Sequence, residues 1–315
     1  MALLGIDLGG TKLALALFDR TGKILYKESH PLENRKGEEV GELILQCLTR
    51  LRDSKIHGKI SSIGIGVPGI YRVKTGTVWA PNIPGWDDYA LLNKIKKYSE
   101  EIPVTIDSDR ACCILGELWH GNAKKCKDAI FLAIGTGIGA GILINGTVLR
   151  GAHDIAGAIG WMALERPFKD EYGDCGCFEY YASGEGIAKT ARKFLKEATG
   201  YTGQLNIKPL EKIDSHDLFA AFEKNDPIAI KVIQLCIEFW GMAAANLVSL
   251  FNPEKIIFGG GVFGPAIPLI PQIKKEAAKW AQPISIHQVN FQSSALGSDA
   301  GVYGAGYLAL KNIHP

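Results

Sequence analysis

Asp109 is the residue of this chain best suited to act as a general base. The surrounding residues, 106–117, read as the end of a strand followed by a helix whose first turn holds Asp109. The positive end of a helix favours an ionised carboxylate, which can accept the proton of a hydroxyl group as that oxygen attacks phosphorus. An acidic residue in the first turn of a helix is also common without any catalytic role, so Asp109 alone does not identify an enzyme.

Two glycine-rich loops offer places for phosphate groups. Each follows an apolar strand and continues into a second strand and a hairpin turn, and the two copies span residues 3–18 and 130–144. Glycine lets backbone N–H groups approach an anion closely, and the hydroxyl groups of Thr11 and Thr136 can donate to phosphate oxygens. The repeated pattern predicts a duplicated fold in which both halves serve one nucleotide.

Two better-known nucleotide-binding folds do not fit these loops. The chain has no G-x-x-x-x-G-K-[S/T] motif, which argues against a P-loop NTPase. Residues 135–141 resemble a dinucleotide-binding fingerprint, but that motif requires the glycines to open a helix. Here they lead into the β-prone residues 142–144 and a turn at Asn145 and Gly146. A Rossmann dehydrogenase is therefore the weaker alternative.

Length and charge indicate a two-lobed protein that acts on a small molecule. The 315 residues exceed the usual size of one hydrophobic core, and 47% of them are hydrophobic. The net charge is only +2 and the charges are interspersed, so we expect neither a nucleic-acid stripe nor a polybasic membrane patch. The most apolar stretch, residues 232–251, contains Gln234, Glu238 and Asn246, which favours a buried helix over a membrane span.

The cysteines and the first residues indicate a cytoplasmic protein. Seven cysteines form an odd set, and residues 1–4 lead directly into a predicted strand without the charged region and cleavage site of an export signal. We therefore expect reduced thiols. The adjacent Cys112 and Cys113 are expected to pack a helix and to have no chemical role.

The remaining elements alternate between helix and strand. Hydrophobic residues at helical spacing predict a helix over 38–52, a strand follows at 60–69, and another strand runs from residue 254 into a glycine-rich turn at 259–261. This alternation predicts an α/β fold. The small residues of 295–310 predict a helix that packs closely against the first lobe.

Two loops of the first lobe carry residues that suit a sugar. Gly69 permits backbone contact with a ligand, and Asn82 can both donate to and accept from neighbouring hydroxyl groups. Trp86 is expected to supply an apolar wall. Each of these residues is also ordinary in a turn, so the argument depends on their combination with Asp109 and the two glycine-rich loops.

Together these motifs resemble the ROK family of sugar kinases over nearly the whole chain. The matching segments are residues 7–12, 66–69, 81–86, 109–117, 135–139 and 259–261. The resemblance implies a two-lobed actin-like ATPase (ribonuclease H-like) α/β fold built from duplicated βββαβαβα-type domains. We place the first lobe at residues 1–108, joined by a C-terminal helix at about 297–315, and the second lobe at 109–296.

The resemblance also implies a role for each matching residue. It implies that ATP lies between the lobes, that Asp109 is the catalytic base, and that Asp7 holds the hydration shell of Mg²⁺. The implied nucleotide-binding residues are Gly9, Gly10, Thr11, Lys12, Gly135, Thr136, Gly137, Gly260 and Gly261. The implied substrate-binding residues are Gly69, Asn82, Ser108, Asp109, Ala158, Trp161 and Glu179. A homodimer is implied by the family alone.

Some residues depart from the family pattern in the sugar region. The family's Asn-Asp-Ala reads Ser108, Asp109 and Arg110 here, and we expect Arg110 to reach solvent or an acidic partner. Ala158 replaces a carboxylate that binds sugar hydroxyl groups, and Trp161 replaces a histidine that binds zinc and sugar. We therefore expect a substrate other than free glucose, such as a hexose with an N-acetyl or other bulky group, a cyclitol or a glycoside.

The cysteine-rich zinc motif of the family is incomplete in this chain. Only Cys177 and Glu179 keep their places, and Cys175 lies two positions before Cys177. Structural zinc requires four nitrogen or sulfur ligands in a tetrahedral array. We therefore expect no structural zinc and interpret both cysteines as packing thiols.

Three functions stay open at this point. ATP-dependent phosphorylation of a hexose-like substrate explains the most residues. A sugar-responsive regulator is the second, because the family includes repressors with a helix-turn-helix before the kinase-like core; we expect no such extension here. The third is a filament-forming relative, or a former kinase that now senses sugar, although nothing in the sequence indicates filaments.

Overall fold

The computed structural model describes residues 1–54, 58–99, 101–206 and 208–313, which form two compact units. The first unit comprises Met1–Cys126, Gly141–Gly157 and Ser294–Pro315, and the second comprises Lys127–Ala140 and Ala158–Ser293. The first unit therefore extends past the predicted limit at residue 108. The reason is that the helix beginning at Asp109 packs on the C-terminal helix, within the same unit.

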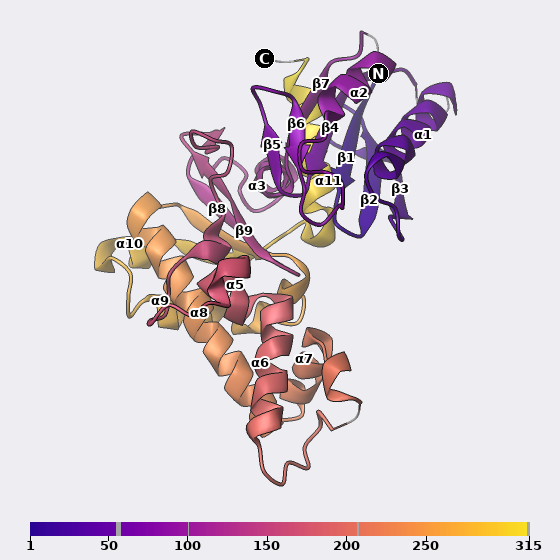
Figure 1. Ribbon diagram of the computed structural model, residues 1–315. Helices are drawn as coiled ribbons and strands as arrows, with labels where there is room; N and C mark the ends of the chain where they lie inside the picture. The colour runs from indigo at the N-terminus through magenta and orange to yellow at the C-terminus, as the bar shows by residue number, and fades with distance from the viewer. Residues whose placement is uncertain (55–57, 100, 207, 314–315) are drawn as a thin grey trace. The chain divides into compact units, whose positions relative to one another are not determined.

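A five-stranded sheet forms the centre of the first unit (Figure 1). Its strand order is β3-β2-β1-β4-β7, with β1 and β4 nearly buried along their whole length. β1 pairs antiparallel with β2 and parallel with β4, and β4 pairs parallel with β7. Burial of both strand faces shows that helices or loops cover the sheet on both sides. The strands are β1 (Ala2–Leu8), β2 (Lys12–Phe18), β3 (Ile24–Pro31), β4 (Ile60–Val67) and β7 (Val104–Ser108).

Both predicted hairpin turns are present. In the first, Oδ1 of Asp19 accepts the N–H groups of Thr21 and Lys23 at 2.8 and 3.0 Å, and Gly22 has a φ of 86°. In the second, Asn145 and Gly146 have φ angles of 50° and 74°. These left-handed conformations explain why the turns use glycine and asparagine.

Helix α1 (Glu38–Ser54) packs on one face of the first sheet, which confirms the helix predicted over 38–52. Its buried residues pack in one hydrophobic core with Leu4 and Ile65 of the sheet. The buried hydrophobic residues of α1 are Val40, Leu43, Ile44, Cys47, Leu48 and Leu51. Helix α2 (Leu91–Ser99) and the short strands β5 (Ile70–Arg72) and β6 (Thr77–Trp79) belong to the same unit.

Helices α3 (Asp109–His120) and α11 (Ala300–Lys311) form hydrophobic clusters separate from that of α1. In one cluster α11 packs on β1 and β2, and in the other α3 packs on α11. A Cβ atom on Gly5 would lie 2.7 Å from the backbone nitrogen of Gly306, and one on Gly64 would lie 1.9 Å from the carbonyl oxygen of Ala305. Only glycine fits at these two strand positions. The predicted close packing of a small-residue helix on the first lobe is therefore confirmed.

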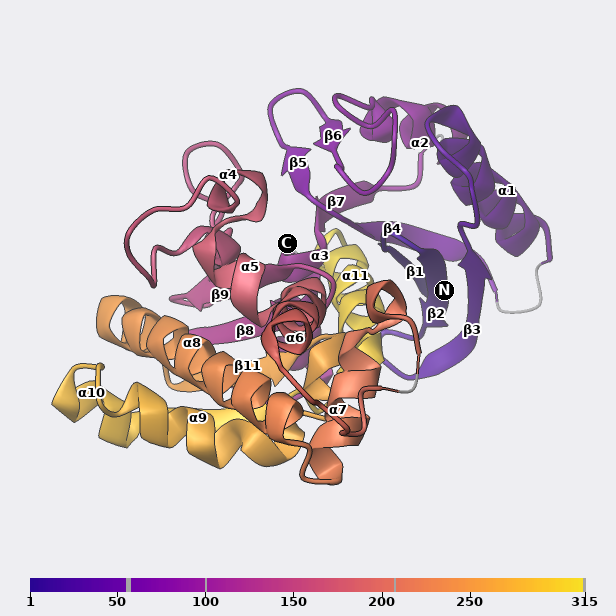
Figure 2. The ribbon, with the colours of Figure 1, turned by 60° about the horizontal axis from the view of Figure 1, so that its bottom comes forward.

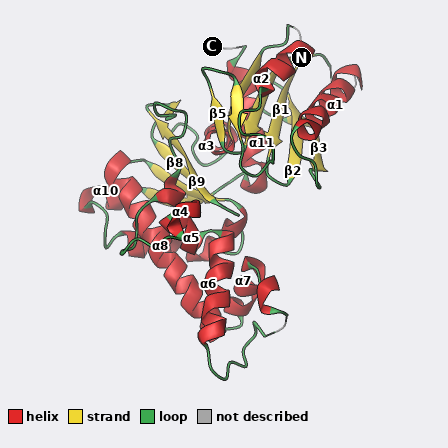
Figure 3. Ribbon diagram, in the orientation of Figure 1, coloured by secondary structure: helices red, strands yellow, loops and turns green. Residues whose placement is uncertain are grey.

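The second sheet, whose strands β8 and β9 are labelled in Figure 3, repeats the topology of the first. Its order is β10-β9-β8-β11-β12, in which β9 and β10 are antiparallel whereas β8, β11 and β12 are parallel. The strands are β8 (Ala129–Ile134), β9 (Ile138–Ile144), β10 (Thr147–Val148), β11 (Lys255–Gly259) and β12 (Asn290–Ser293). This repetition confirms the predicted duplicated α/β fold.

The helices of the second unit gather around its longest helix, α8 (Pro227–Phe251), which lies beside α9 (Figure 2). Asp226 caps α8 by accepting the N–H groups of Ile228 and Ala229, both at 3.0 Å. This helix is long and apolar enough to cross a membrane, but 67% of its most apolar window is buried within the protein, as predicted for a core helix. The other helices are α4 (Tyr172–Cys175), α5 (Cys177–Ala182), α6 (Gly184–Glu197), α7 (Ser215–Glu223), α9 (Ile270–Ala277) and α10 (Pro283–Gln288).

All seven cysteines are free thiols. Cys112 is fully buried and packs with Leu115, Ala305 and Leu308 between α3 and α11. Burial raises the pKa of the Cys112 and Cys113 thiols well above its ordinary value, which leaves them protonated and poorly nucleophilic. This agrees with the packing role predicted for both.

Candidate active site

Asp109 lies where the sequence predicts it, at the start of α3 directly after β7. Ser108 caps the helix, and its hydroxyl oxygen accepts the N–H group of Ala111 at 3.3 Å. Oδ1 of Asp109 accepts the N–H group of Arg110 at 2.7 Å, which orients the carboxylate. Burial raises the pKa of Asp109, so this carboxyl is a better proton acceptor than an exposed aspartate.

Asp7 lies near the end of β1 and is electrostatically coupled to Asp109. Burial and the negative charge of Asp109 raise the pKa of Asp7 to about 7, against the opposing effect of Lys12. A Cβ atom on Gly301 would lie 2.4 Å from Oδ2 of Asp7, so glycine on the neighbouring helix makes room for this carboxylate. Two neighbouring carboxylates in a partly buried setting form a hard oxygen donor set of the kind that Mg²⁺ prefers.

The first glycine-rich loop, Gly9 to Lys12, connects β1 and β2. The N–H group of Gly9 donates to the carbonyl oxygen of Lys12 at 2.9 Å, which closes the turn, and Gly10, Thr11 and Lys12 are exposed. A Cβ atom on Gly10 would lie 3.1 Å from Cβ of Asn82. The fold thus brings the predicted sugar-binding Asn82 beside the predicted phosphate loop.

Gly69 and Arg110 contact each other, which the sequence did not reveal. Gly69 has a φ of 88°, and a Cβ atom there would lie 2.2 Å from the carbonyl oxygen of Trp79, so the position requires glycine. Nη2 of Arg110 donates to the carbonyl oxygen of Gly69 at 3.3 Å. The expectation that Arg110 reaches solvent or an acidic partner did not include this backbone carbonyl, and the residue is also partly exposed.

Trp86 is not the wall of a sugar pocket. Its side chain is 1% exposed, its indole nitrogen donates to the carbonyl oxygen of Gly37 at 2.8 Å, and its ring stacks on Tyr89 at 4.3 Å. The prediction fails because a large aromatic side chain next to a turn gains more by joining the core than by facing a polar ligand.

A buried ion pair lies directly before the predicted base. Nη1 and Nη2 of Arg150 donate to Oδ1 and Oδ2 of Asp107 at 2.9 and 2.6 Å, and the N–H group of Ser108 also donates to Oδ1 at 2.8 Å. Sequence reasoning missed this pair. The available signal was an acidic residue at a buried strand position beside Ile106, which requires a partner because an unpaired buried carboxylate is costly.

In the second unit, two of the predicted glycine-rich segments line one cavity of about 260 Å³. Gly135 and Thr136 come from the loop after β8, and Gly261 follows β11. The N–H group of Gly184 donates to the carbonyl oxygen of Gly135 at 2.7 Å, which joins the start of α6 to this loop. Gly260 has a φ of 90°, and a Cβ atom there would lie 2.4 Å from the carbonyl oxygen of Ile134. The full lining is Gly135, Thr136, Gly184, Glu185, Ala188, Asp214, Ser215, His216, Gly261 and Val262.

The starts of α6 and α7 are the part of this cavity that sequence reasoning missed. Ser183 caps α6 by accepting the N–H group of Gly186 at 3.0 Å, and Asp214 and Asp217 form a capping box at α7. Both caps are readable in the sequence as helix starts. What the sequence does not give is their position beside the Thr136 loop, because that depends on tertiary packing.

Glu179 joins the end of the Thr136 loop to the segment that follows Ala158. Its Oε2 atom accepts the N–H group of Ile138 at 2.6 Å, and Cβ atoms on Gly137 and Gly160 would each lie 2.9 Å from that oxygen. Burial raises the pKa of Glu179. Trp161 lies one residue beyond Gly160 and is 58% exposed, so the indole that replaces the family's histidine is available for contact with a ligand.

The segment 165–181, where the resemblance would place zinc, is held by a polar network. Glu165 accepts hydrogen bonds from Tyr172, from Tyr181 at 2.7 Å and from Lys169 at 2.8 Å. Nζ of Lys169 also donates to the hydroxyl oxygen of Tyr181 at 2.6 Å. Cys177 is buried at the start of α5. These contacts join Glu165, Lys169, Tyr172 and Tyr181 in one network.

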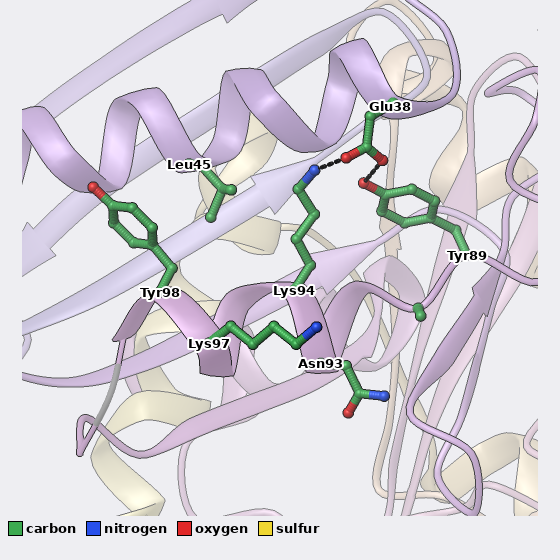
Figure 4. Close-up of a pocket in the computed structure, with 8 residues that line it drawn as sticks. Glu38, Leu45, Tyr89, Asn93, Lys94, Lys97 and Tyr98 are labelled. Carbon is green, nitrogen blue, oxygen red and sulfur yellow. Dashed lines mark hydrogen bonds and ion pairs between the residues drawn. The ribbon is translucent and has the colours of Figure 1, made fainter.

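A second cavity, of about 400 Å³, lies between α1 and α2 of the first unit (Figure 4). None of the predicted site residues lines it. Nζ of Lys94 pairs with Glu38 and, at 2.7 Å, with Glu42, so its charge is already compensated. Nothing in this cavity indicates a particular ligand.

Comparison of the sequence with known proteins identifies its family and its relatives. The sequence model of the family described as "ROK family" matches residues 3–312. A glucokinase from Halalkalibacterium halodurans is 33% identical over 316 residues, which cover 98% of this chain and 94% of that protein.

Two solved structures show the same fold. A ROK family glucokinase from Streptomyces griseus in complex with glucose and AMPPNP has a TM-score of 0.80 and 27% identity, covering 99% of this chain and 100% of that chain. A ROK family transcriptional regulator, described as a homologue of the E. coli MLC protein, has a TM-score of 0.88 and 25% identity, covering 99% of this chain and 78% of that chain. The relatives therefore include both a kinase and a regulator.

Proposed function

This chain belongs to the ROK family, and we propose that it is an ATP-dependent kinase that phosphorylates a hydroxyl group of a hexose or hexose derivative. The observation that carries the proposal is the arrangement of Asp109 at the start of α3 with a raised pKa and Asp7 coupled to it. A regulator that only binds sugar has no need for a proton acceptor beside a second carboxylate. We further propose a cytoplasmic homodimer, on the basis of the family resemblance and the free cysteines.

The proposed reaction begins with proton transfer to Asp109. Its carboxylate accepts the proton of the acceptor hydroxyl as the oxygen attacks the γ-phosphorus of ATP, and the phosphoryl group passes to the sugar while ADP leaves. The N–H group of Arg110 holds Oδ1, so Oδ2 is the oxygen that remains for the substrate. The Asp107–Arg150 pair fixes the backbone from which Asp109 projects.

The second-unit cavity is the proposed nucleotide site. The hydroxyl group of Thr136 and the backbone of Gly137 are the proposed donors to phosphate oxygens, and Gly135 shapes the loop that presents them. The N–H group of Gly184 is already bonded to Gly135, so α6 is proposed to contribute the positive end of its dipole. Gly261 lines the cavity and has open space where a Cβ atom would lie, so it is proposed to permit close approach of the adenosine, with Gly260 forming the turn before it.

The glycine-rich loop of the first unit has its own proposed phosphate-binding role. We propose that Gly9, Gly10, Thr11 and Lys12 contact the phosphates, and that Asp7 holds Mg²⁺ through water. When bound, the ion supplies charge neutralisation at the phosphate oxygens. The coupling between Asp7 and Asp109 supports this role, because a nearby cation favours the ionised form of both carboxylates.

The acceptor is proposed to be a sugar that carries a bulky or apolar substituent. Asn82, Gly69 and Ser108 remain as candidates to contact it, and Glu179 is a separate candidate. At Ala158 the family's carboxylate is absent, and Trp161 offers an exposed indole where the family has histidine. A substituent such as an N-acetyl group, a second sugar ring or a cyclitol ring would gain apolar contact there that unmodified glucose does not need.

A sugar-responsive regulator is the second candidate function. The observation that favours it is the TM-score of 0.88 to a ROK family transcriptional regulator. Altered residues at 158 and 161 are compatible with a protein that binds a sugar without turning it over. Salt-dependent binding to duplex DNA that a sugar relieves would support this candidate.

The experiment that separates the candidates is acceptor-dependent ADP release from Mg·ATP. Hexoses, N-acetylhexosamines, cyclitols and glycosides are each supplied to the wild type and to Asp109→Asn. We expect at least one strong acceptor and a 10²- to 10⁴-fold loss of turnover in the variant, the usual range for a positioned base, with ATP affinity nearly unchanged. Asparagine still accepts the N–H group of Arg110, so the fold is preserved. Equal turnover of both proteins removes Asp109 as base, and no acceptor-dependent ADP removes the kinase.

A further inference from the structure

Three side chains of the first unit form a cluster that includes none of the predicted site residues. Glu28 and His30 lie on the same face of β3, and Cys47 lies on the buried face of α1. A carboxylate oxygen, an imidazole nitrogen and a thiol sulfur from these residues lie within 4.8 Å of one another. We propose that Glu28, His30 and Cys47 bind a divalent transition-metal ion, with Zn²⁺ as the expected ion.

The distance between Glu28 and His30 is that of two ligands on one ion. Oε1 of Glu28 lies 3.4 Å from Nε2 of His30, and ligands about 2.0–2.1 Å from a tetrahedral Zn²⁺ are about 3.3 Å apart. Nε2 is buried and has no hydrogen-bond partner. A buried ring nitrogen that faces a carboxylate oxygen without a hydrogen bond is costly, and a cation bound to both atoms removes that cost.

Cys47 supplies the soft ligand that selects the type of metal. The residue is 4% exposed, so its sulfur is screened from water and would be a weak ligand unless a metal ion stabilises the thiolate. Sulfur, imidazole nitrogen and carboxylate oxygen together suit Zn²⁺ better than Mg²⁺ or Ca²⁺, which prefer oxygen alone. The donor set therefore distinguishes this site from the Mg²⁺ site proposed at Asp7.

Solvent access completes the coordination. The side chain of His30 is 35% exposed, whereas that of Glu28 is 12% exposed. Because Nε2 itself is buried, the proposed route for an ion and for a water in the fourth position opens only when the exposed Arg50 side chain moves away. Three protein ligands with water in the fourth position are the arrangement of catalytic zinc sites and differ from the closed four-ligand structural site that residues 170–179 fail to supply.

Arg50 is the cation that an incoming ion must replace. Its guanidinium donates to Oε1 of Glu28, and Tyr26 donates to Oε2 at 2.8 Å. The side chain of Arg50 is 50% exposed, so it can turn into solvent. Tyr26 then keeps its hydrogen bond to the other oxygen and orients the carboxylate. One cation thus exchanges for another, and the carboxylate is never left unpaired.

A metal ion at this place would link strand β3, at the edge of the sheet, to α1. The expectation of no structural zinc concerns residues 158–179, and the proposed ligands Glu28, His30 and Cys47 lie outside that segment. The ion would stabilise the first unit by binding the folded chain in preference to the unfolded chain.

Cobalt titration tests the proposal on the full chain. Protein freed of metal with a chelator and kept reduced is titrated with Co²⁺, whose thiolate complexes absorb in the near ultraviolet. We expect saturation at one Co²⁺ per chain, a thiolate band, and loss of the band when Zn²⁺ is added. Cys47→Ala should lose the band, and His30→Gln should weaken binding at least about tenfold. Cys175→Ser is the matched control and should keep both band and affinity.

Several results would overturn the site. One is the absence of a saturable band in the wild type, which would leave Glu28 and His30 as a plain ion pair. Another is a band that survives Cys47→Ala but disappears in Cys175→Ser. His30→Gln changes a partly exposed side chain on an edge strand and is therefore expected to fold. Its Co²⁺ binding curve tests the site even if circular dichroism shows that Cys47→Ala is unfolded.

Discussion

Arg150 binds the buried carboxylate of Asp107 with both guanidinium Nη atoms, at 2.9 and 2.6 Å, two residues before Asp109. The N–H group of Ser108 donates to the same carboxylate at 2.8 Å, so the end of β7 directly before α3 is held by two kinds of contact. A bidentate pair of this kind fixes direction as well as distance. Arg150 is therefore a positioning residue for the proposed base, through Asp107.

Replacing Arg150 should reduce both stability and turnover. Arg150→Ala leaves Asp107 buried without its cation, and we expect the free energy of unfolding to fall by about 2–3 kcal/mol, below the full cost of breaking a buried pair because Arg150 is partly exposed. We expect kcat to fall about tenfold, with little change in KM for ATP. Arg150→Lys keeps the charge but not the bidentate contact and should recover only part of both losses. Unchanged kcat in a less stable Arg150→Ala protein would mean that the pair is structural alone.

The raised pKa of Asp7 predicts a pH dependence of stability. In the folded protein this pKa is about 7, whereas in the unfolded chain it is near 3.8. Between these values the folded state binds more protons than the unfolded state, so Asp7 makes stability fall as pH rises from about 4 to about 7. Asp7→Asn removes this contribution. The variant should be more stable than the wild type at pH 7 by roughly 1–2 kcal/mol after solvent screening, and the difference should vanish near pH 4.

Denaturant unfolding of both proteins at several pH values measures this difference, and the comparison cancels the titration of all other groups. A pH-independent difference would show that Asp7 titrates normally. Addition of Mg·ATP at pH 7 should narrow the gap, because a cation beside Asp7 favours its ionised form in the wild type and has less effect on asparagine.

Restoring the family's residues at 158 and 161 should change the preferred acceptor. Ala158→Glu with Trp161→His returns a carboxylate and an imidazole to the proposed sugar region, and the exposed indole is lost. We expect the ratio of kcat/KM for glucose to that for the best substituted acceptor to rise at least about tenfold, the usual range for one or two pocket contacts. Trp161→Ala alone should lower kcat/KM for the substituted acceptor and leave that for glucose nearly unchanged. If glucose is already the best substrate of the wild type, the substituent hypothesis is wrong.

The sequence predicted those parts of the candidate site whose geometry depends on local backbone chemistry. The loop Gly9 to Lys12, the turn at Gly69 and the start of α3 at Asp109 each require residue types that are readable one at a time. The repeated strand pattern likewise gave the duplicated sheet, because strand periodicity is a local property.

The errors and omissions concern partners that are distant in the chain. Arg110 finds the carbonyl oxygen of Gly69, and Arg150 finds Asp107, across 41 and 43 residues. Trp86 joins the core because Tyr89 and Gly37 offer it a stacking face and a hydrogen-bond acceptor. Such contacts cannot be predicted from residue spacing or composition, because they form only when distant parts of the chain pack together.

The polar network around Glu165 predicts how the segment replacing the zinc motif is stabilised. Glu165→Gln keeps the size of the side chain but removes the charge that Lys169, Tyr172 and Tyr181 share. We expect the free energy of unfolding to fall by about 1–2 kcal/mol, since hydrogen bonds to a charged group are stronger than neutral ones but this carboxylate is partly exposed. Cys175→Ser should stay within about 0.5 kcal/mol of the wild type, as is usual away from packed or paired groups.

Denaturant unfolding with and without a chelator decides between the network and a metal in this segment. If the tyrosine hydroxyl groups and Lys169 hold the segment, Cys175→Ser and the wild type respond equally to the chelator, whereas Glu165→Gln is less stable in both conditions. A chelator effect that Cys175→Ser abolishes would instead place a metal ion at Cys175 and Cys177. The two variants distinguish the explanations because they lie in one short segment but remove different interactions: Glu165→Gln removes a shared carboxylate, and Cys175→Ser removes a thiol.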